Sequence, residues 1–242
     1  MRIAFALIAS LALAACGGGD GATTENGTTP EAPAASKLAP PAGKQWVDVV
    51  TKSPEGGMIQ GNPDAPVKLV EYGSRSCPAC QGFAMTGVEP LRAKYISTGQ
   101  VSYEFRDFAL HPQDLGLILI GQCVSPEAFF PILDQMYVEQ QVFNERLTQE
   151  ILTSTEGLGA GPQAKRLMEI MGYIDFMKQR GVPQAQLDKC LGDQAAIDQV
   201  AARQKAGVEK GVNSTPTFYI NDKMFQGGWD DMERELRAAG AR

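Results

Sequence analysis

The sequence has little histidine, no excess of basic residues and only one pair of closely spaced cysteines. Lys and Arg number 22 against 28 Asp and Glu, a net charge of −6, and no basic stripe is present, so a nucleic-acid partner is excluded. No second CxxC or CxxH accompanies the pair, so a zinc site is incomplete and we expect neither a metal nor another cofactor. The sole histidine, His111, follows a predicted strand, and we interpret it as an ordinary loop side chain.

The N-terminus begins with an apolar run that is too short to span a membrane. Residues 3–13 are continuously apolar or small, whereas a spanning helix needs about 20 such residues. We therefore predict a secretory signal peptide over residues 1–15. The run ends in Leu13-Ala14-Ala15-Cys16, which resembles the lipobox of bacterial lipoproteins. That resemblance implies cleavage before Cys16 and its lipidation, whereas in a plain signal peptide Cys16 would be incidental.

Residues 16–45 differ from the rest of the chain in composition. They are rich in Gly, Thr, Pro and Ala and hold almost no large apolar residue before Leu38, which predicts a flexible linker. With a lipid on Cys16, this linker would tether a folded domain over residues 46–242 to the periplasmic face of a bacterial membrane. Gly17 replaces the Asp that often retains lipoproteins at the inner membrane, so the resemblance favours the outer membrane.

Two strands are predicted on either side of the cysteine pair. Residues 67–73 are largely apolar, as in the buried middle of a sheet, and residues 101–108 alternate in polarity. Between them, Cys77-Pro78-Ala79-Cys80 opens a segment with helical spacing, in which Pro90 would introduce a kink. This βαβ unit puts the cysteines at the carboxyl end of its first strand, where open α/β sheets hold their sites.

A long helical region separates this unit from the end of the chain. Residues 112–210 carry helical apolar spacing in several segments joined at Gly and Pro. Residues 217–221 then predict a strand, Asn221-Asp222 a turn, and residues 223–226 the second strand of a hairpin before a final helix. Residues 46–50 fit either a short strand or a short helix. The predicted class is α/β, with a large helical insertion between its two halves.

Two motifs far apart in the sequence carry a family resemblance. The strand–Cys77-Pro78-Ala79-Cys80–helix unit and the later Ser214-Thr215-Pro216 resemble the thioredoxin superfamily, and the helical insertion resembles that of its DsbA-like branch. The resemblance covers residues 58–240 and implies a thioredoxin fold with thiol–disulfide oxidoreductase activity. Its substrates would be protein thiols and disulfides, and an unidentified redox partner would recycle the CxxC pair. It also implies a cis bond at Thr215-Pro216 that contacts the pair and binds extended substrate. The alternative is a trans-proline that opens a strand.

The spacing of Cys77 and Cys80 suits disulfide exchange, in which a thiolate is the nucleophile. Cys77 lies at a predicted helix N-terminus, where unpaired N–H groups and the helix dipole stabilise an anion. Cys80 lies one turn on and can resolve the mixed disulfide, whereas an inert staple over so short a loop would add little stability. Glu71 matches the buried acid of the superfamily, which would relay protons, although a solvated edge residue is the alternative.

Cys123 and Cys190 remain after the CxxC pair and Cys16 are assigned. They fall on separate predicted helices of the insertion, and the sequence leaves open whether they pair or stay as buried thiols. Some DsbA-like proteins carry a second disulfide, so the resemblance favours a structural disulfide between Cys123 and Cys190.

The residues between the cysteines bear on the direction of the reaction. Strong oxidants of the family carry His where this chain has Ala79, so the resemblance implies a less acidic Cys77 and a less oxidising disulfide. Isomerases usually place a dimerisation domain before the catalytic one, and residues 17–57 are too short and polar for that. We therefore expect a monomeric oxidase. The second alternative is a reductase and the third an isomerase. The rival class is a non-enzymatic lipoprotein that delivers Cu(I) from the CxxC pair.

Overall fold

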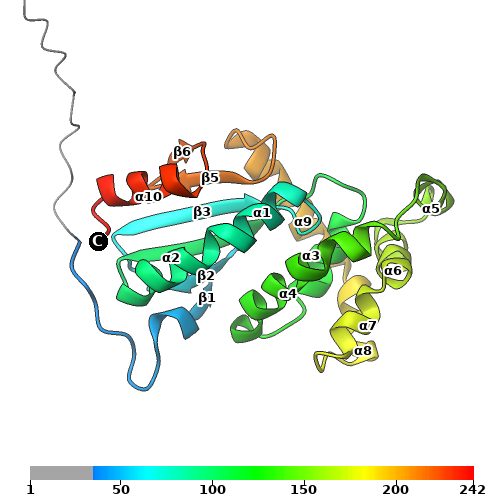
Figure 1. The fold of residues 1–242 in the computed structure, drawn as a ribbon. Helices are drawn as coiled ribbons and strands as arrows, with labels where there is room; N and C mark the ends of the chain where they lie inside the picture. The colour runs from blue at the N-terminus through cyan, green and yellow to red at the C-terminus, as the bar shows by residue number, and fades with distance from the viewer. Residues whose placement is uncertain (1–34) are drawn as a thin grey trace, which may run out of the picture.

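The structure is a computed structural model that describes residues 35–242 (Figure 1). The predicted signal peptide and Cys16 lie outside the described residues. Six strands form one sheet in the order β1-β2-β4-β3-β5-β6. Their bounds are β1 Val50–Lys52, β2 Met58–Gly61, β3 Val67–Gly73, β4 Val101–Asp107, β5 Thr217–Ile220 and β6 Lys223–Phe225. In this part of the chain β3 and β4 run parallel, and the other neighbouring strands pair antiparallel.

The two central strands are those predicted on either side of the cysteine pair. Each residue of β3 pairs with one of β4, from Val67 with Val101 to Gly73 with Asp107. Leu69 and Phe105 on these strands are fully buried, because helices cover this face of the sheet. The predicted α/β class and both strands are confirmed.

The helix after Cys77 is split in two. It consists of α1 (Pro78–Thr86) and α2 (Val88–Lys94), which meet at Gly87. A proline cannot donate to the carbonyl four residues before it and its ring clashes there, so Pro90 disrupts the helix upstream of itself. The predicted kink therefore falls at Gly87.

The predicted helical insertion is confirmed and contains more helices than the sequence pattern separates. Its helices are α3 (Asp114–Gly121), α4 (Pro126–Asn144), α5 (Gln149–Thr155), α6 (Ala160–Met171), α7 (Tyr173–Lys178), α8 (Gln184–Leu191) and α9 (Gln194–Glu209). Gly172 adopts a left-handed conformation, φ 91°, and divides α6 from α7. Asp193 caps α9 by accepting a hydrogen bond from the Ala196 amide.

The insertion lies to one side of the sheet and has a hydrophobic core of its own (Figure 1). The helix α4 contributes to both cores. Its Phe129 and Tyr137 pack with the residues that cover the sheet, whereas Met136 and Phe143 pack within the insertion. The two halves of the molecule therefore share one helix.

The C-terminal hairpin is built as predicted. Asn221 and Asp222 both have positive φ, 46° and 65°, which is the geometry of the tight turn that joins twisted strands. The final helix, α10 (Trp229–Ala238), buries Met232 and Leu236 completely in the core that covers the sheet.

The ambiguous segment near residue 46 resolves into two elements, and contacts with the domain begin before it. Trp46–Asp48 forms a short 3-10 helix, η1, which leads into β1. Upstream, the Ala35 amide donates to the Gly240 carbonyl at 2.8 Å, and the indole of Trp46 donates to the Leu38 carbonyl at 2.7 Å. The chain thus joins the domain earlier than the predicted boundary. Among the helices of residues 35–242, none combines the length and apolar character needed to cross a membrane.

Candidate active site

The CxxC pair lies where β3 leads into the first helix. Cys77 is the N-cap residue of α1, with extended backbone at φ −78° and ψ 122°, and Pro78 follows at the first helical position. Pro78 is suited to this position because the first N–H groups of a helix have no partner within it. The Cys77 residue is 7% exposed, Cys80 is fully buried, and both are thiols in this structure. Cys77 is therefore the sulfur nearer the surface.

A cis peptide bond lies against Cys77. The bond joins Thr215 to Pro216, and the Cys77 thiol donates a hydrogen bond to the Thr215 carbonyl at 3.3 Å. The antiparallel pairing of β5 with β3 brings this loop to the cysteines, although 138 residues separate it from Cys77. Beside Pro216 is a hollow of about 240 Å³, lined by Phe218 and Phe225 and by polar residues such as Ser214 and Gln226.

The two thiols differ strongly in acidity. A hydrogen bond from the Cys80 thiol is the main reason that the pKa of Cys77 is lowered from 9.0 to about 5. Burial opposes this shift, while Thr215 and the backbone N–H groups of Cys80 and Ala79 add to it. The pKa of Cys80 is raised by its hydrogen bond to Cys77, by burial and by the charge of Glu71. Cys77 is thus the thiolate near neutral pH, and Cys80 remains a thiol.

Glu71 lies in the core and not at a sheet edge. Its strand is central, so Glu71 pairs with residues on both neighbouring strands, and only 1% of its surface is exposed. The Tyr103 hydroxyl donates to its Oε2 at 2.6 Å, whereas its buried Oε1 has no hydrogen-bond partner among the described residues. Burial raises the pKa of Glu71 to about 8, against the opposing effect of Tyr103 and with a smaller contribution from Cys77. The solvated alternative is therefore wrong, and Glu71 holds a proton at neutral pH.

The three residues before Cys77 are buried, although nothing in the sequence pattern indicated a role for them. The hydroxyls of Ser74 and Ser76 both donate to the carboxylate of Asp114, at 3.0 and 2.7 Å. The amide of His111 also donates to Asp114, and its ring Nδ1 lies 3.1 Å from the Ser76 hydroxyl. Asp114 begins α3, so the insertion anchors this loop. Because Asp114 is far from the two serines in the sequence, no local pattern predicts this contact.

Arg75 is the largest of these buried side chains. Its guanidinium forms an ion pair with Asp107 at 2.6 Å and lies over the ring of Phe129, 4.9 Å from its centroid. Gly121 leaves room for it, because a Cβ there would collide with the guanidinium. A desolvated ion pair of this kind is costly to break, so the path of the chain into Cys77 is firmly held.

Comparison with known proteins places this fold and site in a family. The family model described as thioredoxin matches residues 53–238. The chain belongs to the thioredoxin family. A Rickettsia bellii protein named "Putative protein-disulfide oxidoreductase" is 27% identical over 179 residues, which cover 72% of this chain and 60% of that protein. The Bacillus subtilis "Disulfide bond formation protein D" is 24% identical over 80% of this chain and 84% of the relative. The thioredoxin-family chain thus spans about 60% or less of the length of its Rickettsia relatives.

Solved structures of the thioredoxin family share the helical insertion. The structure of a protein-disulfide isomerase from Novosphingobium aromaticivorans is similar with a TM-score of 0.70 and 26% identity, over 74% of this chain and 94% of that one. That of Wolbachia pipientis alpha-DsbA1 has a TM-score of 0.61 and 19% identity, over 74% and 88%. The fold of this thioredoxin-family chain is therefore DsbA-like.

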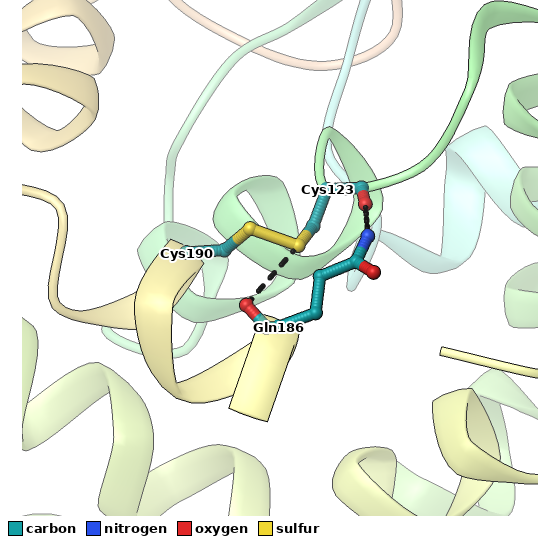
Figure 2. The surroundings of a disulfide bond; sticks show 3 residues. All are labelled: Cys123, Gln186 and Cys190. Atoms are coloured by element: carbon teal, nitrogen blue, oxygen red, sulfur yellow. Dashed lines mark hydrogen bonds between the residues drawn. A yellow bond between two sulfur atoms is a disulfide. The ribbon is translucent and has the colours of Figure 1, made fainter. Parts of the chain in front are cut away.

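The remaining cysteines of the thioredoxin-family domain form a disulfide within the insertion (Figure 2). Cys123 lies just beyond the C-cap of α3, Gln122, and not in a helix, whereas Cys190 lies in α8. Gln186 is beside them: its side-chain amide donates to the Cys123 carbonyl at 2.6 Å, and its own carbonyl oxygen is 3.5 Å from the Cys123 sulfur. The bond joins positions 67 residues apart and cross-links α3 to α8.

Proposed function

We propose that this chain is an exported thiol–disulfide oxidoreductase that exchanges disulfides with protein substrates through Cys77 and Cys80. The observation that carries the proposal is the placement of Cys77. It is a helix N-cap with a pKa lowered to about 5, and its sulfur lies against the carbonyl before a cis-proline. The names of the Rickettsia and Bacillus relatives support the same chemistry.

The proposed reaction begins with the oxidised pair. A substrate thiolate attacks the Cys77 sulfur, which breaks the Cys77–Cys80 bond and forms a mixed disulfide with the substrate. Cys80 leaves as a thiolate and gains a proton. The second substrate thiolate then attacks the substrate sulfur of the mixed disulfide and releases the Cys77 thiolate. Two electrons have passed from the substrate to the pair, and a redox partner must remove them.

Glu71 is the proposed proton donor to Cys80. With a pKa of about 8 it carries a proton at neutral pH, and its charge raises the pKa of Cys80, so the two groups interact. Tyr103 occupies one oxygen of Glu71 and leaves the other without a partner among the described residues. Donation to the departing Cys80 thiolate would speed exchange, and the proton would return during reoxidation.

Thr215 and Pro216 are the proposed substrate-binding residues. When Cys77 is a protonated thiol, the Thr215 carbonyl accepts its hydrogen bond. The Cys77 thiolate, the Cys77–Cys80 disulfide and the mixed disulfide have no such hydrogen, so in these forms the carbonyl is free to accept an N–H from an extended substrate. The hollow beside Pro216, with both aromatic and polar residues in its lining, would receive a substrate side chain.

Oxidation of dithiols is the proposed direction. A pKa of about 5 for Cys77 lies between the roughly 3.5 of DsbA and the roughly 7 of thioredoxin. A stabilised thiolate favours the reduced pair and makes the disulfide oxidising, so this intermediate acidity fits a moderate oxidant with Ala79 in place of His. The second candidate is an isomerase, which the name of the Novosphingobium neighbour favours.

We further propose that the chain acts outside the cytoplasm as a monomeric lipoprotein. Net disulfide formation requires an oxidising compartment, such as the bacterial periplasm. The lipobox-like residues before Cys16 support lipidation there, and the linker would hold the domain near the membrane surface, with the outer membrane favoured. Mass spectrometry of the membrane fraction tests this, because a mature protein without a lipid on Cys16 would refute it.

The function is tested with purified oxidised protein and a reduced dithiol peptide. The wild-type protein is expected to oxidise one peptide per CxxC pair, and the Cys77→Ser variant none. The Cys80→Ser variant, mixed with a peptide disulfide, is expected to accumulate a mixed disulfide that mass spectrometry detects. Oxidation that survives in Cys77→Ser would refute the mechanism. Faster turnover of a scrambled disulfide protein than of the dithiol peptide would favour the isomerase, and Cu(I) binding without any exchange would favour the delivery protein.

A further inference from the structure

Four consecutive main-chain carbonyls lead into α1, and one face of α4 supplies a hydrogen-bond donor to each. The pairs are the Tyr137 hydroxyl with the Ser74 carbonyl at 3.3 Å, the Gln140 amide with the carbonyls of Arg75 at 3.0 Å and Cys77 at 3.1 Å, and the Asn144 amide with the Ser76 carbonyl at 3.1 Å. Residues three, four and seven apart share one face of a helix, so these three side chains form a single stripe. Every carbonyl from residue 74 to 77 therefore points toward the insertion.

Gln140 is the central member of this stripe. Only 1% of its surface is exposed, and its Nε2 donates to two carbonyls at once. A buried amide costs free energy unless its hydrogen bonds are made, so an apolar side chain would serve packing alone at least as well. The amide of Gln140 is therefore explained by the hydrogen bonds that it donates to the loop, and not by packing in the core.

The carbonyl of Cys77 is the contact that matters for chemistry. The ψ angle of Cys77 sets the direction of its carbonyl and, through the next peptide, the direction of the first turn of α1 relative to the sulfur. The carbonyl accepts from the Gln81 amide at 3.1 Å and from Gln140. On the other side of this junction, Cys77 is the N-cap of α1, and the backbone N–H groups of Ala79 and Cys80 in its first turn contribute to the lowered pKa of the Cys77 thiol. Fixing the carbonyl therefore also fixes the donors of the sulfur.

We propose that Gln140, assisted by Asn144, is a positioning residue that holds Cys77 in the orientation in which its sulfur receives the N–H groups of the first turn of α1. The inference rests on the proposed function, in which this sulfur is the nucleophile. It assigns to the insertion a part in setting the acidity of Cys77 and the redox potential of the pair. Neither residue touches the reacting sulfur.

The test replaces Gln140 by a side chain of similar length without a donor. In Gln140→Met we expect the acid dissociation constant of Cys77, measured by the ultraviolet absorbance of its thiolate, to fall about tenfold. We expect the equilibrium constant with glutathione to change about tenfold in favour of the disulfide, which corresponds to about 30 mV. The matched control is Gln141→Met on the same helix, since Gln141 is exposed and donates to Glu145. This control is expected to match the wild type in both measurements.

Three results would overturn the proposal. One is a folded Gln140→Met variant with the wild-type thiolate titration, and another is an equal shift in Gln141→Met. If Gln140→Met does not fold, the half-buried Asn144→Ala provides the comparison, and the absence of any shift in that variant is the third. The titration needs no substrate. A wild-type protein that titrates as expected but fails to oxidise a dithiol peptide would refute the proposed function and leave the positioning role supported.

Discussion

Replacement of Glu71 by Gln is expected to abolish the pH dependence of stability that this side chain imposes. Burial raises the pKa of Glu71 from 4.5 to about 8 in the folded protein. A raised folded-state pKa means that the stabilising contribution is complete below pH 4.5 and is lost as the pH rises through 8. The variant has no such proton to lose, so its stability should not fall with the wild type over this interval.

The size of the effect follows from the same interval. Each pH unit between the two pKa values is worth about 1.4 kcal/mol, so the wild type loses roughly 5 kcal/mol, as an upper bound, relative to the variant. In the variant, the amide nitrogen at position 71 would take the place of Oε1, which has no partner among the described residues. The protonated wild-type carboxyl also places a donor there, but the amide has one N–H more, and an unsatisfied buried donor costs up to about 1–3 kcal/mol at every pH. The variant should therefore be no more stable than the wild type at pH 4 and more stable at pH 9, with the two stabilities crossing at one pH in between.

Urea unfolding from pH 4 to 9 measures this difference directly. The oxidised protein is the appropriate form, because the Cys77–Cys80 disulfide removes both thiols from the titration and with them the small contribution of Cys77 to the pKa of Glu71. The pH dependence of stability that comes from all other titrating groups is the same in the two proteins, so it cancels in the difference between them. Free energies of unfolding that stay parallel over the whole range would refute a buried, proton-bearing Glu71.

Three further outcomes are expected. Alkylation of Cys77 in the reduced protein should stay near its maximum down to about pH 6 and fall tenfold per unit below pH 5, as iodoacetamide kinetics would show; a midpoint near pH 9 would contradict the acidity of the thiol. Arg75→Met should cost about 3–5 kcal/mol in urea unfolding, because it leaves the buried Asp107 without its cation. Joint replacement of Cys123 and Cys190 by Ser should cost about 4 kcal/mol, since the bond closes a loop of 67 residues, yet leave dithiol oxidation intact. Loss of oxidation in a folded double variant would contradict this.

Local patterns were sufficient for the elements that surround the CxxC pair. The strand at residues 67–73 is largely apolar because both of its edges are paired and five of its seven residues are buried, so its composition identifies a central strand. Asn221-Asp222 predicts its hairpin because these residue types tolerate the positive φ that the turn requires. The apolar spacing of residues 112–210 does not by itself separate α6 from α7, although Gly172 between them is a residue type that commonly ends a helix.

Contacts between distant segments could not be read in this way. The burial of Glu71 depends on the strands placed on both sides of it, so the sequence left its environment open. Asp114 and Gln140 look like ordinary polar residues of helices, and nothing local indicates that they bind the loop before Cys77. Their roles appear only when the insertion is packed against the sheet, because the donors and acceptors lie far apart in the sequence and no local pattern links them.

The helix α4, shared by the two hydrophobic cores, bears on how the molecule unfolds. Phe129 and Tyr137 belong to the core over the sheet, and Met136 and Phe143 to the core of the insertion, on a single continuous helix. Neither core can open without exposing apolar side chains of the other, which couples them into one cooperative unit. We therefore expect the insertion to unfold together with the redox centre in a single transition, and not as a detachable subdomain.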